Sequence, residues 1–199
     1  MGASDTVGVG ADDPERQAWV VRLFERLPEG SEFVRLGVSG STAAQAIEEQ
    51  LPRAVEAKGD LTTVWLAVND FNAFVELPQY EEDLEEILKA LSGSSTRVFV
   101  GNLPNLTGVP IYSQIPPAIL AGRVDQWNLA IEVVAERNGA VVVDLFPASM
   151  QLDQQGVSLI AADGFHPSTE GYRVLADVFW TAIRTDEEIG PRVSQRPRQ

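Results

Sequence analysis

The chain has 199 residues and a mass of 21.6 kDa, and 44% of its residues are hydrophobic while 22% are charged. This length and composition indicate one globular domain with its own core, and the lack of cysteine excludes disulfides, thiolate zinc sites and a thiol nucleophile. A net charge of −14 opposes binding to nucleic acids and to anionic membrane surfaces, so we expect neither as a partner. The sequence as printed shows no membrane span and no signal peptide, which predicts a soluble, cytoplasmic protein; a secreted or anchored form stays open if upstream residues are missing.

The first half of the chain predicts two helices and two strands. Asp13 and Pro14 begin a helix that runs to Leu27, and residues 33–38 form a strand. Ser41 caps a second helix, with a kink at Pro52, that ends near Gly59. The apolar run Leu61–Val68 then predicts a buried strand.

The second half continues this alternation. We expect helices over residues 80–91, 121–137 and 169–183, and strands over residues 97–101 and 141–145. Strands that alternate with helices favour a three-layer α/β/α sandwich with a parallel sheet. The sequence therefore predicts one domain over residues 1–184, followed by a disordered tail over residues 185–199.

His166 is the only histidine, and it lies three residues after Asp163. Histidine titrates near neutral pH, and a carboxylate one turn away can orient its ring for proton transfer. A polar residue at a turn before a helix would explain the same pattern, so the hexapeptide alone leaves both interpretations open.

Other polar residues follow the predicted strands, where parallel α/β sheets collect their ligands. Ser39-Gly40-Ser41-Thr42 follows one strand, Asn69-Asp70 follows the next, and Ser4 lies close to the start of the chain. Together they suggest a hydrolase in which Ser4 attacks a carbonyl, His166 takes its proton and Asp163 orients the imidazole. The backbone N–H groups of Ser4 and Gly40 and the side-chain amide of Asn69 are candidates for the oxyanion hole.

Four sequence blocks resemble those of the SGNH hydrolase superfamily, also called GDSL esterases and lipases, and they occur in the family's order. They are Gly2-Ala3-Ser4-Asp5-Thr6-Val7-Gly8, Leu36-Gly37-Val38-Ser39-Gly40, Ala67-Val68-Asn69-Asp70 and Asp163-Gly164-Phe165-His166-Pro167. The resemblance implies the SGNH, flavodoxin-like type of sheet. It also gives Ser4, Gly40, Asn69 and His166 the four roles for which the family is named, with Asp163 as the third member of the triad.

The chain also departs from the family pattern. Ala3 replaces the usual aspartate before the nucleophile, Ala67 replaces a glycine, and Arg35 stands where asparagine is frequent. The family also has a strand that delivers the serine, whereas only three residues precede Ser4 here. The first strand is therefore apparently missing from the given sequence, and its absence would leave a gap between the strands at residues 33–38 and 61–68. Two explanations stay open: the sequence lacks upstream residues, or the sheet is rearranged.

Each candidate residue also has a purely structural explanation when it is taken alone. Ser4 fits a disordered terminus, Gly40 a tight turn, and Asn69 and Asp70 a turn that bonds its own backbone. We expect no metal site, although Asp5, Asp12 and Asp13 would suit loose binding of calcium or magnesium.

The sequence thus predicts a serine esterase that hydrolyses small-molecule esters and needs no metal or organic cofactor. A long loop over residues 103–120, rich in proline and apolar residues, is a candidate acyl pocket for short or medium chains. Two alternatives stay open: a catalytically silent SGNH-like binding module, and an acyltransferase of the same fold. The oligomeric state is unknown at this stage.

Overall fold

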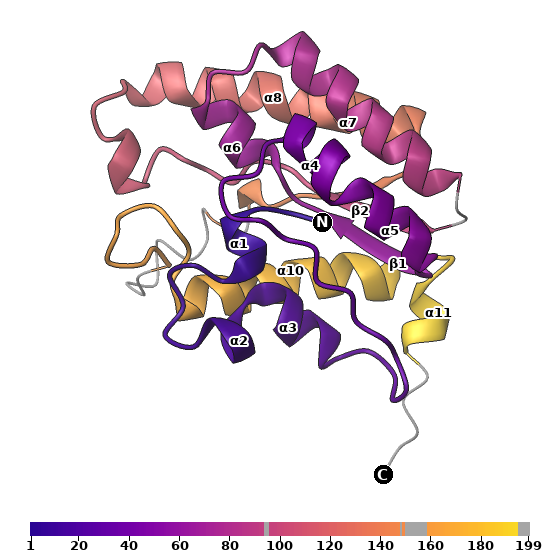
Figure 1. Cartoon of the computed structure of the whole chain (residues 1–199). Helices are drawn as coiled ribbons and strands as arrows, with labels where there is room; N and C mark the ends of the chain where they lie inside the picture. The colour runs from indigo at the N-terminus through magenta and orange to yellow at the C-terminus, as the bar shows by residue number, and fades with distance from the viewer. Residues whose placement is uncertain (94–95, 148, 150–158, 195–199) are drawn as a thin grey trace.

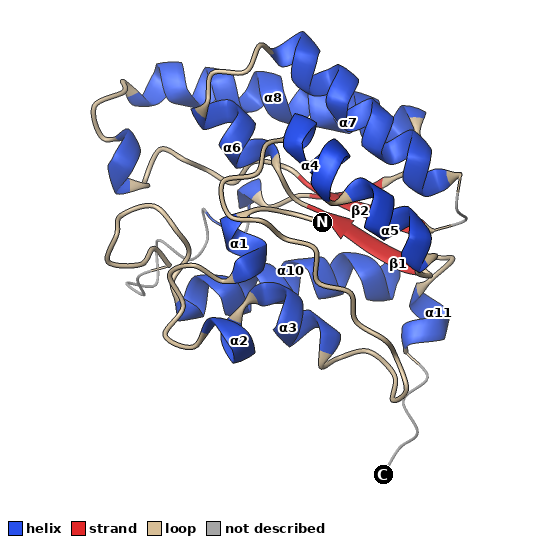
Figure 2. Ribbon diagram, in the orientation of Figure 1, coloured by secondary structure: helices blue, strands red, loops and turns tan. Residues whose placement is uncertain are grey.

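The sheet has three parallel strands and lies between two layers of helices in the computed structural model, which describes residues 1–93, 96–147, 149 and 159–194 (Figures 1 and 2). The strands are β1 (Leu61–Val64), β2 (Arg97–Gly101) and β3 (Val141–Val143), in the order β1-β2-β3. Thr63 pairs with Phe99, and Phe99 pairs with Val141. The predicted α/β class with a parallel sheet is confirmed.

Helices cover both faces of the sheet (Figure 1). On one face lie α1 (Ser4–Val7), α2 (Pro14–Gln17), α3 (Trp19–Phe24), α10 (Thr169–Thr185) and α11 (Gly190–Val193). On the other lie α4 (Ala43–Glu49), α5 (Leu51–Ala57), α6 (Ala67–Asn72), α7 (Leu77–Ser92) and α8 (Pro117–Arg137). A short 3₁₀ helix, η1 (Pro110–Tyr112), lies in the long loop before α8.

Side-chain caps begin two of these helices. The Thr42 hydroxyl accepts from the Gln45 N–H while the Gln45 side chain accepts from the Thr42 N–H, a reciprocal capping box. The cap is therefore Thr42, one residue later than the predicted Ser41. Ser168 caps α10 by accepting from the Gly171 N–H.

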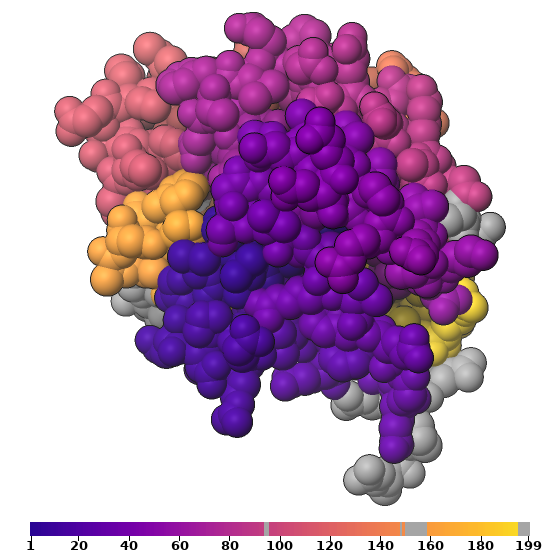
Figure 3. Space-filling view, in the orientation of Figure 1, coloured from indigo at the N-terminus to yellow at the C-terminus, as the bar shows by residue number. Residues whose placement is uncertain are grey.

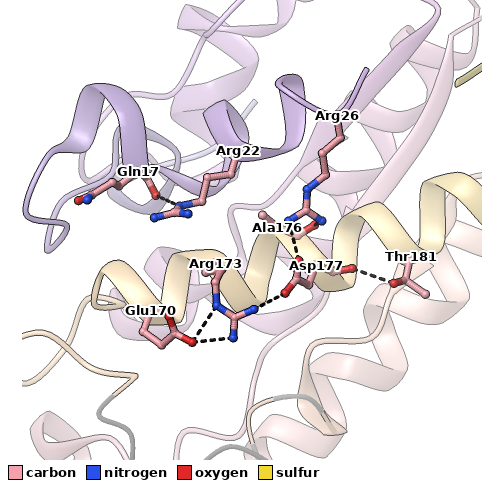
Figure 4. Close-up of polar contacts among 8 residues, drawn as sticks. All are labelled: Gln17, Arg22, Arg26, Glu170, Arg173, Ala176, Asp177 and Thr181. Carbon is pink, nitrogen blue, oxygen red and sulfur yellow. Dashed lines mark hydrogen bonds and ion pairs between the residues drawn. The ribbon is translucent and has the colours of Figure 1, made fainter. Parts of the chain in front are cut away.

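The helices α3 and α10 pack against each other within one layer and cover one face of the sheet. Trp19 stacks on Phe179 with ring centroids 4.2 Å apart, and both side chains are buried. At the surface, the Asp177 carboxylate accepts from Arg26 of the segment after α3 and from Arg173 of its own helix (Figure 4). Because these ion pairs are partly exposed, solvent screens them and they contribute little to the contact between α3 and α10. Burial of the Trp19 and Phe179 rings therefore stabilises this contact more than the ion pairs do.

Three predicted elements differ in detail. The helix expected over residues 14–27 is split into α2 and α3, because Ala18 adopts an extended conformation (φ −55°, ψ 142°). The strand expected over residues 61–68 ends at Val64, and α6 begins at Ala67. Part of the predicted tail is ordered: α11 packs Val193 into the core, next to buried Ile189, while residues 195–199 lie outside the described residues.

The predicted strand over residues 33–38 is wrong, since this segment carries no strand pairing. A parallel strand needs a neighbour along its whole length, and among the described residues only Met1 and Gly2 lie between this segment and β1. Phe33, Val34 and Val38 are accordingly exposed, although strand residues of a covered sheet are normally buried. Within the described ranges, no helix has the length and apolar character needed to cross a bilayer.

Candidate active site

Gly2 makes backbone interactions with Gln50, Val38 and Trp65, and these position the first residues of the candidate site. The Gln50 side chain accepts from the Gly2 N–H and donates to the Gly2 carbonyl, both at 2.9 Å. The Val38 N–H donates to the same carbonyl at 3.1 Å, and Gly2 forms a parallel bridge with Trp65. Because Gln50 is only 1% exposed, these contacts are shielded from water and hold the backbone firmly.

Ser4 is the first residue of α1, two residues after this anchor, and it is buried. The helix lasts a single turn, since Gly8 follows it in the left-handed conformation (φ +87°). Arg35 donates to the carbonyl oxygens of Thr6 and Val7, which have no partner within so short a helix. Arg35, noted in the sequence only as a departure from the family pattern, thus fixes the turn that carries Ser4.

The loop around His166 is shaped by Asp163. One carboxylate oxygen of Asp163 accepts from the N–H groups of Phe165 (2.9 Å) and His166 (3.0 Å), and Gly164 between them adopts φ +74°. The hydrogen bond from the Phe165 N–H, and after it the one from the His166 side chain, hold the pKa of Asp163 below its ordinary value. The carboxylate is therefore charged and ready to accept from the imidazole.

A continuous hydrogen-bonded chain joins Asp163, His166 and Ser4. Nδ1 of His166 lies 2.6 Å from Oδ2 of Asp163, and Nε2 lies 3.1 Å from Oγ of Ser4. The two segments are 162 residues apart in the sequence, yet the orange loop that carries His166 lies beside the indigo N-terminal residues (Figures 1 and 3). This is the geometry that a base needs to take a proton from a hydroxyl.

The candidate oxyanion-hole residues lie on neighbouring loops. The Asn69 side chain donates to the Ser41 carbonyl at 3.0 Å, next to Gly40, which adopts φ +82° and is exposed. The Val38 N–H bond to Gly2 then ties this loop to the segment that leads into Ser4. Within the described part of the chain, neither Gly40 nor Asn69 bonds Ser4 directly, and Asn69 has a second N–H to offer.

Two buried carboxyl groups near the site, Asp5 and Asp70, were not predicted to take part in catalysis. Burial raises the pKa of Asp5 to about 6, although nearby His166 opposes this effect. Burial also raises the pKa of Asp70 to about 7, and this carboxyl accepts from the Ala43 N–H at the start of α4. An aspartate directly after Ser4 is visible in the sequence, but its burial is not.

An aromatic wall lies beside His166. The Phe165 ring packs edge-on against the imidazole with centroids 4.8 Å apart, and Tyr112 packs against Phe165 at 6.4 Å. The Tyr112 hydroxyl donates to Asn72 at 2.6 Å, which fixes this ring. The Ile111 N–H also donates to the Gly164 carbonyl, so the long loop before α8 contacts the histidine loop directly.

Acidic residues do not gather into a metal site where the structure can be described. No group of three or more His, Asp or Glu side chains among those residues has the geometry to hold an ion. Asp12 instead accepts from the Thr169 hydroxyl at 3.0 Å, and the Asp13 N–H donates to Gln17.

Comparisons with known proteins agree with this architecture. The model of the GDSL-like lipase/acylhydrolase family matches residues 1–174. The crystal structure of TesA aligns with a TM-score of 0.73 at 23% identity, covering 92% of this chain and 94% of that one. An acetylxylan esterase, Axe2 from Geobacillus stearothermophilus, aligns with a TM-score of 0.72 at 19% identity, covering 91% and 90%. A lipolytic G-D-S-L family protein from Veillonella parvula aligns at 0.73 and 20% identity, covering 93% and 96%. No curated protein matches the sequence.

Proposed function

Since the chain belongs to the GDSL-like lipase/acylhydrolase family, we propose that it is an esterase that works through an acyl-serine intermediate. Ser4 is the nucleophile, His166 the general base and Asp163 the carboxylate that orients the imidazole. The observation that carries this proposal is the hydrogen-bonded chain from Asp163 Oδ2 through His166 to Ser4 Oγ, with distances of 2.6 and 3.1 Å.

In the first half of the reaction, the Ser4 hydroxyl attacks the ester carbonyl while Nε2 of His166 takes its proton. The negative charge on the carbonyl oxygen is stabilised by the N–H groups of Ser4 and Gly40 and by the free N–H of Asn69. The tetrahedral intermediate then collapses, the ester C–O bond breaks, and the imidazolium returns its proton to the departing alcohol.

In the second half, His166 takes a proton from water, and the resulting hydroxide attacks the acyl-serine carbonyl. The bond to Ser4 Oγ breaks, Oγ regains a proton from the imidazolium, and the carboxylic acid leaves. Asp163 stays ionised throughout and stabilises the positive imidazole, a role that agrees with its lowered pKa.

We further propose a preference for short or medium acyl chains. Support comes from Tyr112 and Phe165, which pack close to His166 and take up room beside the reacting atoms. Buried Val109 and exposed Ile111 continue this apolar surface outward along the loop. Rates on p-nitrophenyl acetate, octanoate and palmitate test the preference, and a steady increase up to palmitate would contradict it.

The catalytic assignment is tested by labelling with a fluorophosphonate probe and by hydrolysis of p-nitrophenyl acetate. We expect Ser4→Ala to abolish labelling and both Ser4→Ala and His166→Ala to lower kcat by about 10³-fold or more. Ser92→Ala, at an exposed serine at the end of α7, is the matched control and should retain full activity. Labelling that persists in Ser4→Ala would overturn the assignment, and a folded chain without labelling or hydrolysis would favour the silent binding module.

A further inference from the structure

Arg123 of α8 lies against two aromatic side chains near the end of α6. Its Cζ atom lies over the Phe71 ring, 4.4 Å from the centroid, and 5.5 Å from the centroid of the Phe74 ring. Phe71 is buried, whereas Phe74 is 74% exposed. These contacts restrain the planar guanidinium, and its N–H donors remain at the edges for another partner.

The charge of Arg123 is not neutralised by a carboxylate of the protein. Within residues 1–93, 96–147, 149 and 159–194, Arg123 forms no ion pair. The positions three and four residues away on α8 are Ile119, Leu120, Gln126 and Trp127. None of them is acidic, although the chain has 29 acidic residues and only 15 lysines and arginines. The guanidinium is therefore available to an anion from solution.

Phe74 adopts a backbone conformation that favours glycine. Its φ is +55°, and the Val75 N–H donates to the Asp70 carbonyl at 3.1 Å to close the turn that ends α6. Glycine is the usual residue at this position of a helix end, and a phenylalanine there is strained. Because the ring is mostly exposed, its burial does not compensate for the strain. Among the described ring contacts, Phe74 makes one, with Arg123, which indicates a role for the ring beyond folding.

Phe74 and Arg123 lie close to the candidate oxyanion hole. Asn69 is on the first turn of α6, and Phe74 follows it by five residues, which corresponds to about 8 Å along a helix axis. Ile119, one turn before Arg123 on α8, and Ile111, in the loop before α8, are both exposed. This loop borders the histidine loop at the surface, where the Ile111 N–H donates to the Gly164 carbonyl (Figure 3). A small ester bound at the candidate site therefore has apolar surface along which it can extend to Arg123.

Tyr112 connects the surroundings of Arg123 with those of His166. Its ring centroid lies 6.4 Å from that of Phe71 and 6.4 Å from that of Phe165, and Phe165 packs against His166. Burial raises the pKa of the Tyr112 hydroxyl to about 12, and the positive charge of Arg123 is among the influences that lower it. The charge of Arg123 is therefore felt at a side chain beside the reacting residues.

From these observations we propose that Arg123 and Phe74 form a subsite for a carboxylate on the substrate, so that the enzyme prefers esters that carry a negative charge away from the reacting bond. The inference rests on the proposed esterase function. The edge of the guanidinium binds the two carboxylate oxygens, while the Phe74 ring covers the neighbouring methylene groups. Because the net charge of −14 repels anions in general, such a substrate needs a local cation without a partner. The carboxylate belongs either to the acyl chain or to the alcohol, and the experiment separates these two sources.

The test compares kcat/KM for anionic and neutral esters in matched pairs. The acyl arm pairs the mono-p-nitrophenyl ester of suberic acid with p-nitrophenyl octanoate, and the alcohol arm pairs 4-acetoxybenzoate with phenyl acetate. We expect Arg123→Gln to lower the anionic-to-neutral ratio by about tenfold or more in one arm, which identifies the part of the substrate that carries the carboxylate. Arg53→Gln, at an exposed arginine of α5, is the matched control and should leave both ratios unchanged. Ratios that are the same in Arg123→Gln and in the unchanged chain would overturn the subsite.

A second variant, Phe74→Gly, separates the ring from its backbone. Glycine adopts positive φ without strain, so we expect no loss of Tm, while the anionic-to-neutral ratio falls by about threefold or more in the same arm. A lower Tm with an unchanged ratio would show that the Phe74 ring serves folding and would remove it from the subsite.

Binding to Ser4→Ala, measured by isothermal titration calorimetry, gives a readout that does not need catalysis. The probes are monomethyl against dimethyl suberate, and 4-acetoxybenzoate against phenyl acetate. The anionic member of one pair should bind about tenfold more tightly or more, and Arg123→Gln in the same background should remove this difference. Hydrolysis of neutral esters with equal affinities within both pairs would overturn the subsite and leave the proposed function intact. Binding that depends on Arg123 in a chain without hydrolysis would support the subsite and contradict the proposed function.

Discussion

The two sides of the segment Met1–Gly2 differ in how many of the backbone N–H and C=O groups have hydrogen-bond partners. Towards Ser4, Gly2 is bonded by Gln50 and Val38 and bridged to Trp65, all next to a buried core. Away from Ser4, the edge of β1 faces a groove, and the facing segment carries exposed Phe33 and Val34. The comparison teaches that the Gln50 side chain, through its two hydrogen bonds to Gly2, helps to position the segment that carries Ser4.

Among the substitutions that test this difference, we expect the largest loss of stability from Gln50→Leu, which removes both hydrogen bonds between Gln50 and Gly2. The Gly2 N–H and carbonyl would lose buried partners, so we expect a loss of about 2–4 kcal/mol in the free energy of unfolding. Activity should fall as well, because Ser4 follows Gly2 by two residues. Urea unfolding and ester hydrolysis measure both effects, with Gln126→Leu at an exposed site of α8 as the control. Equal stability of the two variants would show that the hydrogen bonds between Gln50 and Gly2 are unimportant.

We expect a smaller change in stability with pH, caused by the two buried carboxyl groups near Ser4, those of Asp5 and Asp70. Burial raises the pKa of Asp70 to about 7 and that of Asp5 to about 6, above the ordinary value of 3.8. A raised pKa means that the folded state binds the proton more tightly, so the stability that these two carboxyl groups contribute is greatest at low pH and is lost as pH rises towards 7. The lowered pKa of Asp163 acts in the opposite direction, but only in more acidic solution.

Burial lowers the pKa of the Met1 amine to about 5, which adds stability as pH rises over the same range, so the prediction concerns the difference between variants. We expect the free energy of unfolding to change with pH differently in Asp70→Asn, with a more positive slope between pH 5 and pH 7 than in the unchanged chain. Urea unfolding at pH 5, 6, 7 and 8 measures the slope, and Asp125→Asn at an exposed site is the matched variant. If Asp70→Asn and Asp125→Asn gave the same slope, the raised pKa of Asp70 would be refuted.

The smallest effect is expected at the groove wall. Val34 is 49% exposed, whereas Leu36, two residues later on the same segment, is 7% exposed. Val34→Ala should change the free energy of unfolding by less than about 0.5 kcal/mol. Leu36→Ala should cost about 2 kcal/mol or more. If Val34→Ala and Leu36→Ala lowered the free energy of unfolding by similar amounts, Val34 would be packed as tightly as Leu36, and the expected difference between the two positions would be wrong.

Local sequence patterns predicted much of the fold because its helices and strands have clear periodicity. The strand at residues 97–101 and the helix that begins at residue 169 occur where expected, since apolar spacing and a serine cap define them. The segment at residues 33–38 has the composition of a strand but lacks a neighbour to pair with. Strand composition therefore did not suffice without a pairing partner.

The candidate site was predictable to the extent that its residues form short blocks. Asp163 and His166 are three residues apart, and the structure joins them to Ser4 by hydrogen bonds, while their catalytic roles remain a proposal. Gln50 and Arg35 were not predicted as supports, because each bonds backbone groups across 28 or more residues. Such contacts leave no local pattern in a single sequence.

The separation of 162 residues between Ser4 and His166 also affects folding. Contacts between distant parts of a chain are entropically slow to form, so the reacting pair should come together late, after the sheet and most helices have assembled. Recovery of ester hydrolysis after dilution from urea would then lag behind recovery of helical circular dichroism. Enzymatic turnover would thus report the arrival of the native state and not of a partly assembled intermediate.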